Sequence, residues 1–250
     1  MFSVIRKMLG RSPVFAFNLV NRDRWVAAQA AQVPNGSQVL DVGAGSCPYR
    51  PLFAHCEYRA QDFTALKGDQ LRSGGYGQID YVCDATAIPA ADGGFDAILC
   101  TEMLEHVPDP VAVIKEFARL LKPGGRLLLT APLGSGIHQE PHHYYGGFTP
   151  YWYQRFLAQV GFRDIKVESN AGSYKFFAQE AIRFLSTSRP FARLPPIVSL
   201  FWLPVWICLL PILGGVIPLV CHGLDQYDQD RHFTVGYHVT ATRADVDVAA

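Results

Sequence analysis

The chain has 250 residues, with 22 Lys and Arg against 22 Asp and Glu, so its formal net charge is zero. This length can bury a sizeable core, and we expect one α/β domain with an insertion rather than two full domains. Because there is no overall positive field, nucleic acid is not expected as a partner. The six cysteines form no C-x-x-C pair, which is typical of reduced thiols in the cytoplasm.

Residues 1–34 are assigned to an N-terminal helical segment with a break near Pro13. Its first piece mixes apolar residues with Arg6, Lys7 and Arg11, which suits either a helix at a membrane surface or one packed on the domain's own core. No long apolar run or small-residue cleavage site follows, so we do not expect a secretory signal.

A buried strand followed by a glycine turn is predicted at residues 39–47. Gly43 and Gly45 remove side chains where the backbone must bend sharply, so that a ligand can approach main-chain N–H groups. Prolines are tolerated in a first helical turn, so a helix is expected to begin between residues 46 and 50. Dinucleotide-binding turns have a third glycine where this chain has Pro48, which makes NAD a poor match.

Two further strands end in acids. Residues 57–62 end in Asp62, which lies 21 residues beyond Asp41, and residues 79–85 contain Asp84. A carboxylate at the tip of the second strand can accept hydrogen bonds from two vicinal hydroxyls of a ribose. The alternative for Asp62 is a turn cap at an exposed strand end.

The rest of the core alternates strands and helices. Strands are predicted at 95–100, 126–131 and 162–168, helices at 110–121 and 149–160, and a last strand at 233–241. Asp109-Pro110 and Thr149-Pro150 supply the cap and the first-turn proline of the two helices.

The run D-V-G-A-G-S-C-P-Y-R at residues 41–50 resembles the first motif of class I S-adenosylmethionine-dependent methyltransferases. T-E-M-L-E-H-V at residues 101–107 resembles the segment that follows the fourth strand in small-molecule members. The resemblance implies an α/β, Rossmann-like, doubly wound seven-stranded sheet. It covers a core at 35–170 and a closing strand at 233–243, with a tail at 244–250. A hydrophobic insertion at 171–232 separates strands six and seven.

The resemblance also implies S-adenosyl-L-methionine as cofactor and Asp84 as the acid that contacts adenine. The predicted cofactor site comprises Asp41, Gly43, Ala44, Gly45, Asp62, Asp84, Ala85, Thr101 and Glu102.

The loop at 132–148 should border the methyl acceptor, because ligands of open α/β sheets bind beyond the carboxyl ends of the strands. The predicted catalytic candidates are His138, His142, His143 and Tyr144, with His138 as the candidate base for a hydroxyl acceptor. Histidines tied to backbone carbonyls are the alternative. His138 and His142 are four apart, but Pro141 opposes the helix that would align them, so no metal site is predicted. The loop is similar to H-x-x-P-x-D-Y-x-R-[FY]-T of members that act on sugars, polyketides and lipids.

The insertion carries no charged residue between Arg193 and Asp225. An amphipathic helix at 174–185 precedes it, and an apolar stretch of this length suits a membrane, with a lid over the site or a dimer contact as alternatives. Prolines at 204, 211 and 218 predict two short apolar pieces, 197–210 and 212–220, that enter one leaflet and return.

The sequence therefore favours an S-adenosylmethionine-dependent methyltransferase that methylates oxygen on a lipid-like or lipid-linked acceptor at a membrane surface. It would be cytoplasmic and peripheral or monotopic at the inner face of the membrane, and its oligomeric state is left open. The rivals are a soluble enzyme acting on a sugar or polyketide and a non-catalytic cofactor-binding scaffold.

Overall fold

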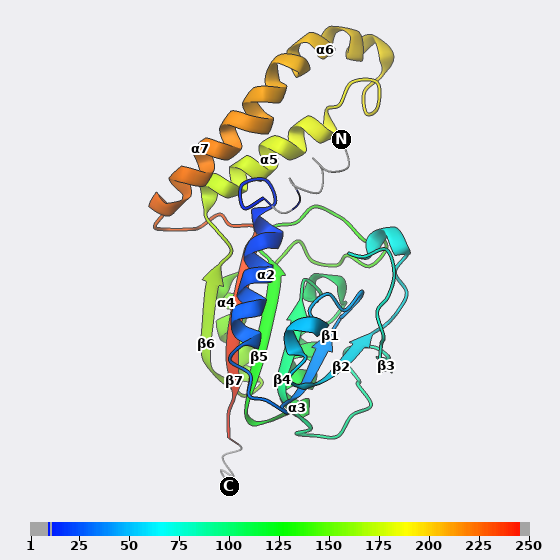
Figure 1. The fold of residues 1–250 in the computed structure, drawn as a ribbon, viewed down its shortest axis with the longest axis vertical. Helices are drawn as coiled ribbons and strands as arrows, with labels where there is room; N and C mark the ends of the chain where they lie inside the picture. Colours follow the sequence, from blue (N-terminus) through cyan, green and yellow to red (C-terminus); the bar gives the residue numbers. More distant parts are fainter. Residues whose placement is uncertain (1–9, 11, 246–250) are drawn as a thin grey trace. The chain divides into compact units, whose positions relative to one another are not determined.

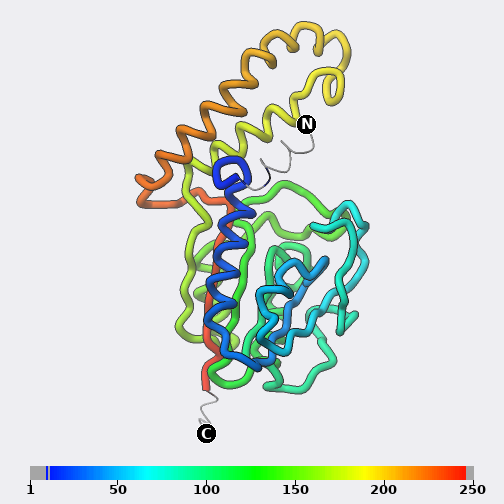
Figure 2. Tube along the Cα trace, in the orientation of Figure 1, coloured from blue at the N-terminus to red at the C-terminus, as the bar shows by residue number. Residues whose placement is uncertain are grey.

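The computed structural model describes residue 10 and residues 12–245, so the predicted helix over the first residues lies outside the described part. The chain divides into two compact units (Figures 1 and 2). The core unit runs from Arg22 to Glu168 and resumes at Gly236. The second unit joins the chain up to Asn21 with Ser169–Val235.

The core unit is built on a seven-stranded sheet in the order β3-β2-β1-β4-β5-β7-β6. The strands are β1 (Gln38–Val42), β2 (Glu57–Asp62), β3 (Tyr81–Val82), β4 (Phe95–Thr101), β5 (Leu121–Pro132), β6 (Phe162–Ser169) and β7 (Gly236–Arg243). β1 pairs in parallel with β2 and β4, and β4 with β5, whereas β7 runs antiparallel to β5. The predicted seven-stranded α/β fold is confirmed.

Helices cover both faces of this sheet because successive strand residues point to opposite sides. On one side, Val26 of α2 (Phe17–Ala30) belongs to the same buried cluster as Val39 and Leu128. The other side holds α3 (Pro110–Leu120) and α4 (Pro150–Gln159), whose apolar residues share a cluster with Leu40 and Leu127. β1 and β5 therefore contribute alternate residues to two cores.

Both predicted helix caps are confirmed. The side chain of Asp109 accepts a hydrogen bond from Ala112 N at 2.9 Å, and that of Thr149 accepts one from Trp152 N at 3.3 Å. Each cap is followed by a proline whose missing N–H would have no helical partner in any case.

The helix expected after the glycine turn is wrong. The chain makes only a 3₁₀ turn, η1 (Arg50–Phe53), held by i→i+3 bonds such as Leu52 N to Tyr49 O at 2.9 Å. Pro48 and Pro51 both lack the N–H that an α-helix would use, and β2 already begins at Glu57. The segment is thus too short and too poor in donors for an α-helix.

The third strand is also shorter than predicted. The carboxylate of Asp80 accepts a hydrogen bond from Ala60 N at 2.8 Å, and Gln61 Nε2 donates to Cys83 O at 2.6 Å. Side chains therefore take main-chain groups on both sides of β3, which leaves two residues in the ladder.

The second unit contains a helical hairpin closed at its base. α5 (Ser173–Thr187) is followed by α6 (Pro196–Pro211), the π-turn η4 (Ile212–Val216), α7 (Ile217–Leu224) and the 3₁₀ turn η5 (Asp225–Tyr227). The buried carboxylate of Asp225 accepts hydrogen bonds from Gly172 N at 3.1 Å and Lys175 N at 3.0 Å. The residue that ends the hairpin thus caps the helix that starts it.

The predicted break near Pro211 is wrong, because the helix is continuous from Pro196 to Tyr227 over 32 residues. η4 absorbs the irregularity: the N–H of Ile217 donates to Ile212 O, an i→i+5 bond that accommodates the extra residue. Within the described residues this is the one helix long and apolar enough, by length and composition, to cross a membrane.

Candidate active site

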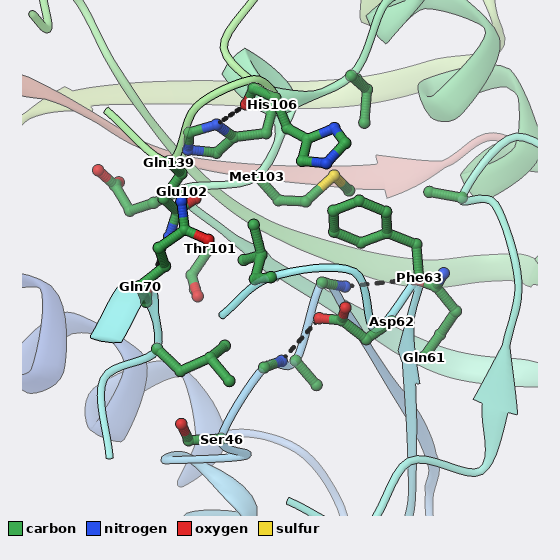
Figure 3. Close-up of a pocket in the computed structure, with 18 of the residues that line it drawn as sticks. Ser46, Gln61, Asp62, Phe63, Gln70, Thr101, Glu102, Met103, His106 and Gln139 are labelled. Atoms are coloured by element: carbon green, nitrogen blue, oxygen red, sulfur yellow. Dashed lines mark hydrogen bonds between the residues drawn. The ribbon is translucent and has the colours of Figure 1, made fainter. Parts of the chain in front are cut away.

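A cavity of about 410 Å³ lies in the core unit where β1, β2 and β4 end (Figure 3). Its lining brings together eight of the nine predicted cofactor-site residues: Gly43, Ala44, Gly45, Asp62, Asp84, Ala85, Thr101 and Glu102. These residues come from four separate stretches of sequence, at or just after the ends of β1 to β4, and parallel strands bring their carboxyl ends to the same edge of the sheet. The volume is within the range of small-molecule sites.

The glycine turn forms one wall of this cavity. Gly43 has φ +71°, and a Cβ there would meet Met103 Cγ at 2.5 Å. The N–H groups of Gly43 and Ala44 both donate to Gln61 O at 3.0 Å, and that of Gly45 donates to Asp62. The main-chain N–H groups of these three residues are therefore not free to bind a ligand, contrary to the prediction from the sequence. The glycines instead allow a ligand to come close to the backbone of the turn.

Asp62 is almost fully buried and is bonded through both carboxylate oxygens. Oδ2 accepts from Gly45 N and Oδ1 from Thr64 N, each at 2.9 Å. Asp84 is exposed at the cavity mouth, and its Oδ1 accepts from Thr86 N at 2.8 Å. Asp84 Oδ1 also accepts from Thr86 Oγ1 at 2.6 Å, so the acceptor capacity left for a ligand is that of Asp84 Oδ2 and of the second lone pairs of Asp62.

Asp41 is the predicted residue that does not line the cavity. It is buried beneath the turn and accepts a hydrogen bond from the Tyr58 hydroxyl. Burial raises the pKa of Asp41 to about 7, with Asp62 adding to the shift. The position of Asp41 indicates that it stabilises the glycine turn and does not contact the ligand.

The segment after β4 forms another wall of the cavity. Glu102 has φ +49°, a left-handed conformation that is uncommon outside glycine, and its N–H donates to Thr130 O at 2.8 Å. Its Oε1 accepts from Thr130 Oγ1 at 2.8 Å, while its Oε2 lies 3.3 Å from Arg22 Nη1. Arg22 was not predicted. Arg22 precedes the first strand and belongs to no motif in the sequence. It reaches the cavity only because helix α2 packs on the sheet.

The histidine loop between β5 and α4 places only some of its predicted catalytic residues at the cavity. His142 and Tyr144 line the cavity, whereas His138 and His143 do not. The His142 ring packs edge-on against Phe63 with centroids 5.0 Å apart. Tyr144 N donates to Glu105 O at 2.9 Å, which attaches the loop to the segment after β4. His106, within the T-E-M-L-E-H-V motif, also lines the cavity and was not predicted as a site residue.

Comparisons with known proteins agree with this geometry. Residues 40–129 match a family model described as a methyltransferase domain. A ubiquinone biosynthesis O-methyltransferase of Xanthomonas axonopodis pv. citri is 41% identical over 127 residues, which are 48% of this chain and 52% of that protein. The chain spans about half the length of the curated relatives it matches.

Solved structures share the fold at low identity. A phosphoethanolamine N-methyltransferase 2 of Haemonchus contortus, in complex with S-adenosyl-L-methionine, matches at TM-score 0.53 and 17% identity, over 96% of this chain and 59% of that chain. The [4+2]-cyclase SpnF matches at TM-score 0.54 and 17% identity, over 90% and 81%. The fold thus supports more than one chemistry. Residues 40–129 nevertheless match a methyltransferase domain, and the same fold is found in a solved methyltransferase with S-adenosyl-L-methionine bound.

Proposed function

We propose that the protein transfers the methyl group of S-adenosylmethionine to a hydroxyl oxygen of a lipid-tailed acceptor at the cytoplasmic face of a membrane. The observation that carries the proposal is the meeting of the glycine turn, Asp62, Asp84 and Glu102 around one cavity at the ends of parallel strands. Curated relatives named as ubiquinone biosynthesis O-methyltransferases support oxygen as the acceptor atom and a lipid-tailed ring as its carrier.

The cofactor would lie along the strand ends. Asp62, buried beside the turn, would accept hydrogen bonds from the ribose hydroxyls through its remaining lone pairs. Asp84 would accept from the exocyclic amine of adenine, and the N–H of Ala85 would reach a ring nitrogen. The positive substituents at the other end of the cofactor would face the Glu102 wall.

The acceptor would enter beside the histidine loop. In the transfer step the hydroxyl oxygen attacks the methyl carbon in line with the sulfur, the O–CH₃ bond forms, the S–CH₃ bond breaks, and the hydroxyl proton leaves to a base. Of the four predicted catalytic candidates, His142 and Tyr144 line the cavity. We therefore propose His142 as the base in place of His138, with Tyr144 positioning the acceptor.

The apolar helix of the second unit supports a membrane site for the reaction. Ile197 and Phe201 are each 76% exposed and Leu200 is 65% exposed, along a helix without a charged residue from 194 to 224. The indoles of Trp202 and Trp206 donate to Ser188 O and Leu185 O of the same unit, which orients their rings. We propose that residues 171–232 form a membrane-contacting insertion whose exposed face enters the lipid interface.

The six cysteines are all free thiols, which supports a reducing compartment and hence the cytoplasmic face.

The test uses purified protein, S-adenosylmethionine carrying a labelled methyl group, and two extracts of the same cells, one of membrane lipids and one of water-soluble metabolites. We expect label in a lipid that loses a free hydroxyl. Label confined to the water-soluble extract would support a soluble acceptor instead. Calorimetric binding of the donor with no label in either extract would support a non-catalytic scaffold.

A further inference from the structure

We propose that His106, His138 and His143 form a binding site for a transition-metal ion of the zinc class, which fastens the histidine loop to the segment after β4. The three residues come from two separate stretches: His106 ends the 3₁₀ turn η3 (Leu104–His106), and the other two belong to the loop between β5 and α4. One ring nitrogen from each lies within 4.8 Å of the other two. The ring centroids are 4.7 Å apart for His106–His138 and His138–His143, and 5.5 Å for His106–His143.

Hydrogen bonds outside the cluster determine which nitrogens carry protons. Nδ1 of His106 donates to His142 O, and Nδ1 of His138 donates to Gly136 O at 2.9 Å. A carbonyl oxygen can only accept, so in both neutral rings Nδ1 bears the hydrogen and Nε2 keeps its lone pair. An N–H bonded to a backbone carbonyl is the usual outer contact of a histidine that ligates a metal.

His143 supplies the third donor and an independent observation. Its Nδ1 is buried and has no hydrogen-bond partner among the described residues. A buried polar atom without a partner costs free energy in the folded protein, and a bound ion would supply that partner. Each of the three rings thus has one nitrogen with a free lone pair, and one nitrogen of each ring lies within 4.8 Å of the other two.

The donor set selects the class of ion. Imidazole nitrogens suit zinc and its neighbours, whereas calcium and magnesium prefer oxygen. Zinc bonds to nitrogen at about 2.0–2.1 Å, and three histidines leave a fourth position for water. Binding requires the nitrogens to draw closer together, and Gly134 and Gly136 on one side of the cluster allow the loop to adjust.

A metal ion bound to the three histidines would affect the wall of the cavity. His142 and Tyr144, which line the cavity, lie on either side of His143 in the chain. An ion bound to the trio would hold these two side chains in place and would reduce the motion of the loop.

The test uses the full-length protein without a histidine tag, stripped with a chelator and titrated with Zn²⁺ alone by calorimetry. We expect one tight site in the wild type, and an affinity reduced by more than about 100-fold in His138→Ala and His143→Ala, since the loss of an outer partner alone costs about 10–100-fold. His142→Ala is the matched control: it removes a histidine of the same loop outside the trio and should keep the tight site. Co²⁺ should give the intense visible bands of a tetrahedral site in the wild type and in His142→Ala only.

Hydrogen exchange supplies a second readout that does not depend on activity. Zn²⁺ should slow the exchange of amides 134–147 in the wild type and not in His138→Ala, while thermal unfolding of the metal-free variants shows that they are folded. Equal Zn²⁺ affinity in the wild type and His138→Ala, or loss of the site in His142→Ala, would overturn the assignment. Tight binding without slower exchange in the loop would overturn its role as a fastener.

Discussion

The carboxylate of Asp62 is hydrogen bonded to Gly45 N at 2.9 Å, so the tip of the second strand is attached to the glycine turn. The same residue lines the cavity while it is 3% exposed. One side chain therefore shapes the turn and offers acceptors to a ligand.

This double role predicts the behaviour of two substitutions at Asp62. Asp62→Ala should weaken binding of S-adenosylmethionine about 10- to 150-fold, because each hydrogen bond to a charged group contributes about 1.5–3 kcal/mol. Asp62→Asn keeps one carbonyl oxygen for Gly45 N and should fall between Ala and the wild type. Calorimetry measures the affinities, and Asp69→Ala, an exposed acid that does not line the cavity, is the control. Unchanged affinity in Asp62→Ala would remove this residue from the cofactor site.

The buried pair Tyr58 and Asp41 should stabilise the fold. Tyr58→Phe keeps the ring, which packs on Phe53, but removes the hydroxyl that donates to the buried Asp41 carboxyl. We expect the free energy of unfolding to fall by about 1–3 kcal/mol, as for a buried polar group left without its partner. Urea denaturation of Tyr58→Phe, Asp41→Asn and the double variant isolates the pairwise contribution. Additive effects would mean that the two side chains do not interact.

His238 predicts a loss of stability at acid pH. It is buried and stacks on Trp25 with ring centroids 5.0 Å apart, and burial lowers its pKa to about 4, against the opposing effect of Glu102. In the unfolded chain its pKa is about 6.5, so the unfolded state takes up the proton first as the pH falls. Its stability contribution is complete above about pH 6.5 and is lost progressively toward pH 4. His238→Phe should remove that loss.

Asp41→Asn should act in the opposite direction over the same range, because the folded-state pKa of Asp41 is raised to about 7. The wild type loses this contribution as the pH rises from about 4 to 7, and the asparagine does not titrate. Urea denaturation at pH 5 and pH 7 decides both predictions. The free energy of unfolding at pH 7 minus that at pH 5 should be smaller than in the wild type for His238→Phe. It should be larger than in the wild type for Asp41→Asn. Shifts of the same sign would contradict the assigned pKa values.

Local signals were sufficient to predict most of the fold. The apolar runs of the central strands and the caps at Asp109 and Thr149 depend on neighbouring residues, and the structure confirms them. Strand-end positions predicted the cavity lining equally well, since the carboxyl ends of parallel strands must meet. Asp41 is the exception, because its depth below the turn depends on its contact with Tyr58.

Features without a clear signal in the local sequence could not be predicted. The prolines near 211 indicated a break, yet a π-turn carries the helix through. The pairing of side chains around β3 involves Gln61 and Asp80 on different segments. His106 lies far in sequence from His138 and His143, so only the folded loop shows that the three rings meet.

We propose that the methyl group passes to an acceptor in a membrane that the apolar helix contacts. Leu200→Glu combined with Phe201→Glu places two charges on the exposed face of α6, where each carboxylate costs on the order of 2–3 kcal/mol in lipid. The control, Gln226→Glu with Gln229→Glu, adds the same charge at exposed positions outside the apolar stretch.

The decisive measurement is methyl transfer from labelled S-adenosylmethionine to vesicles made of the native membrane lipids, with vesicle binding measured by sedimentation and donor affinity by calorimetry. We predict that the wild type and the control bind and methylate the vesicles. The Leu200→Glu, Phe201→Glu variant should lose at least about tenfold in both while keeping its donor affinity. Methylation of the vesicles by this variant at the wild-type rate, or a wild type that does not bind them, would contradict the account.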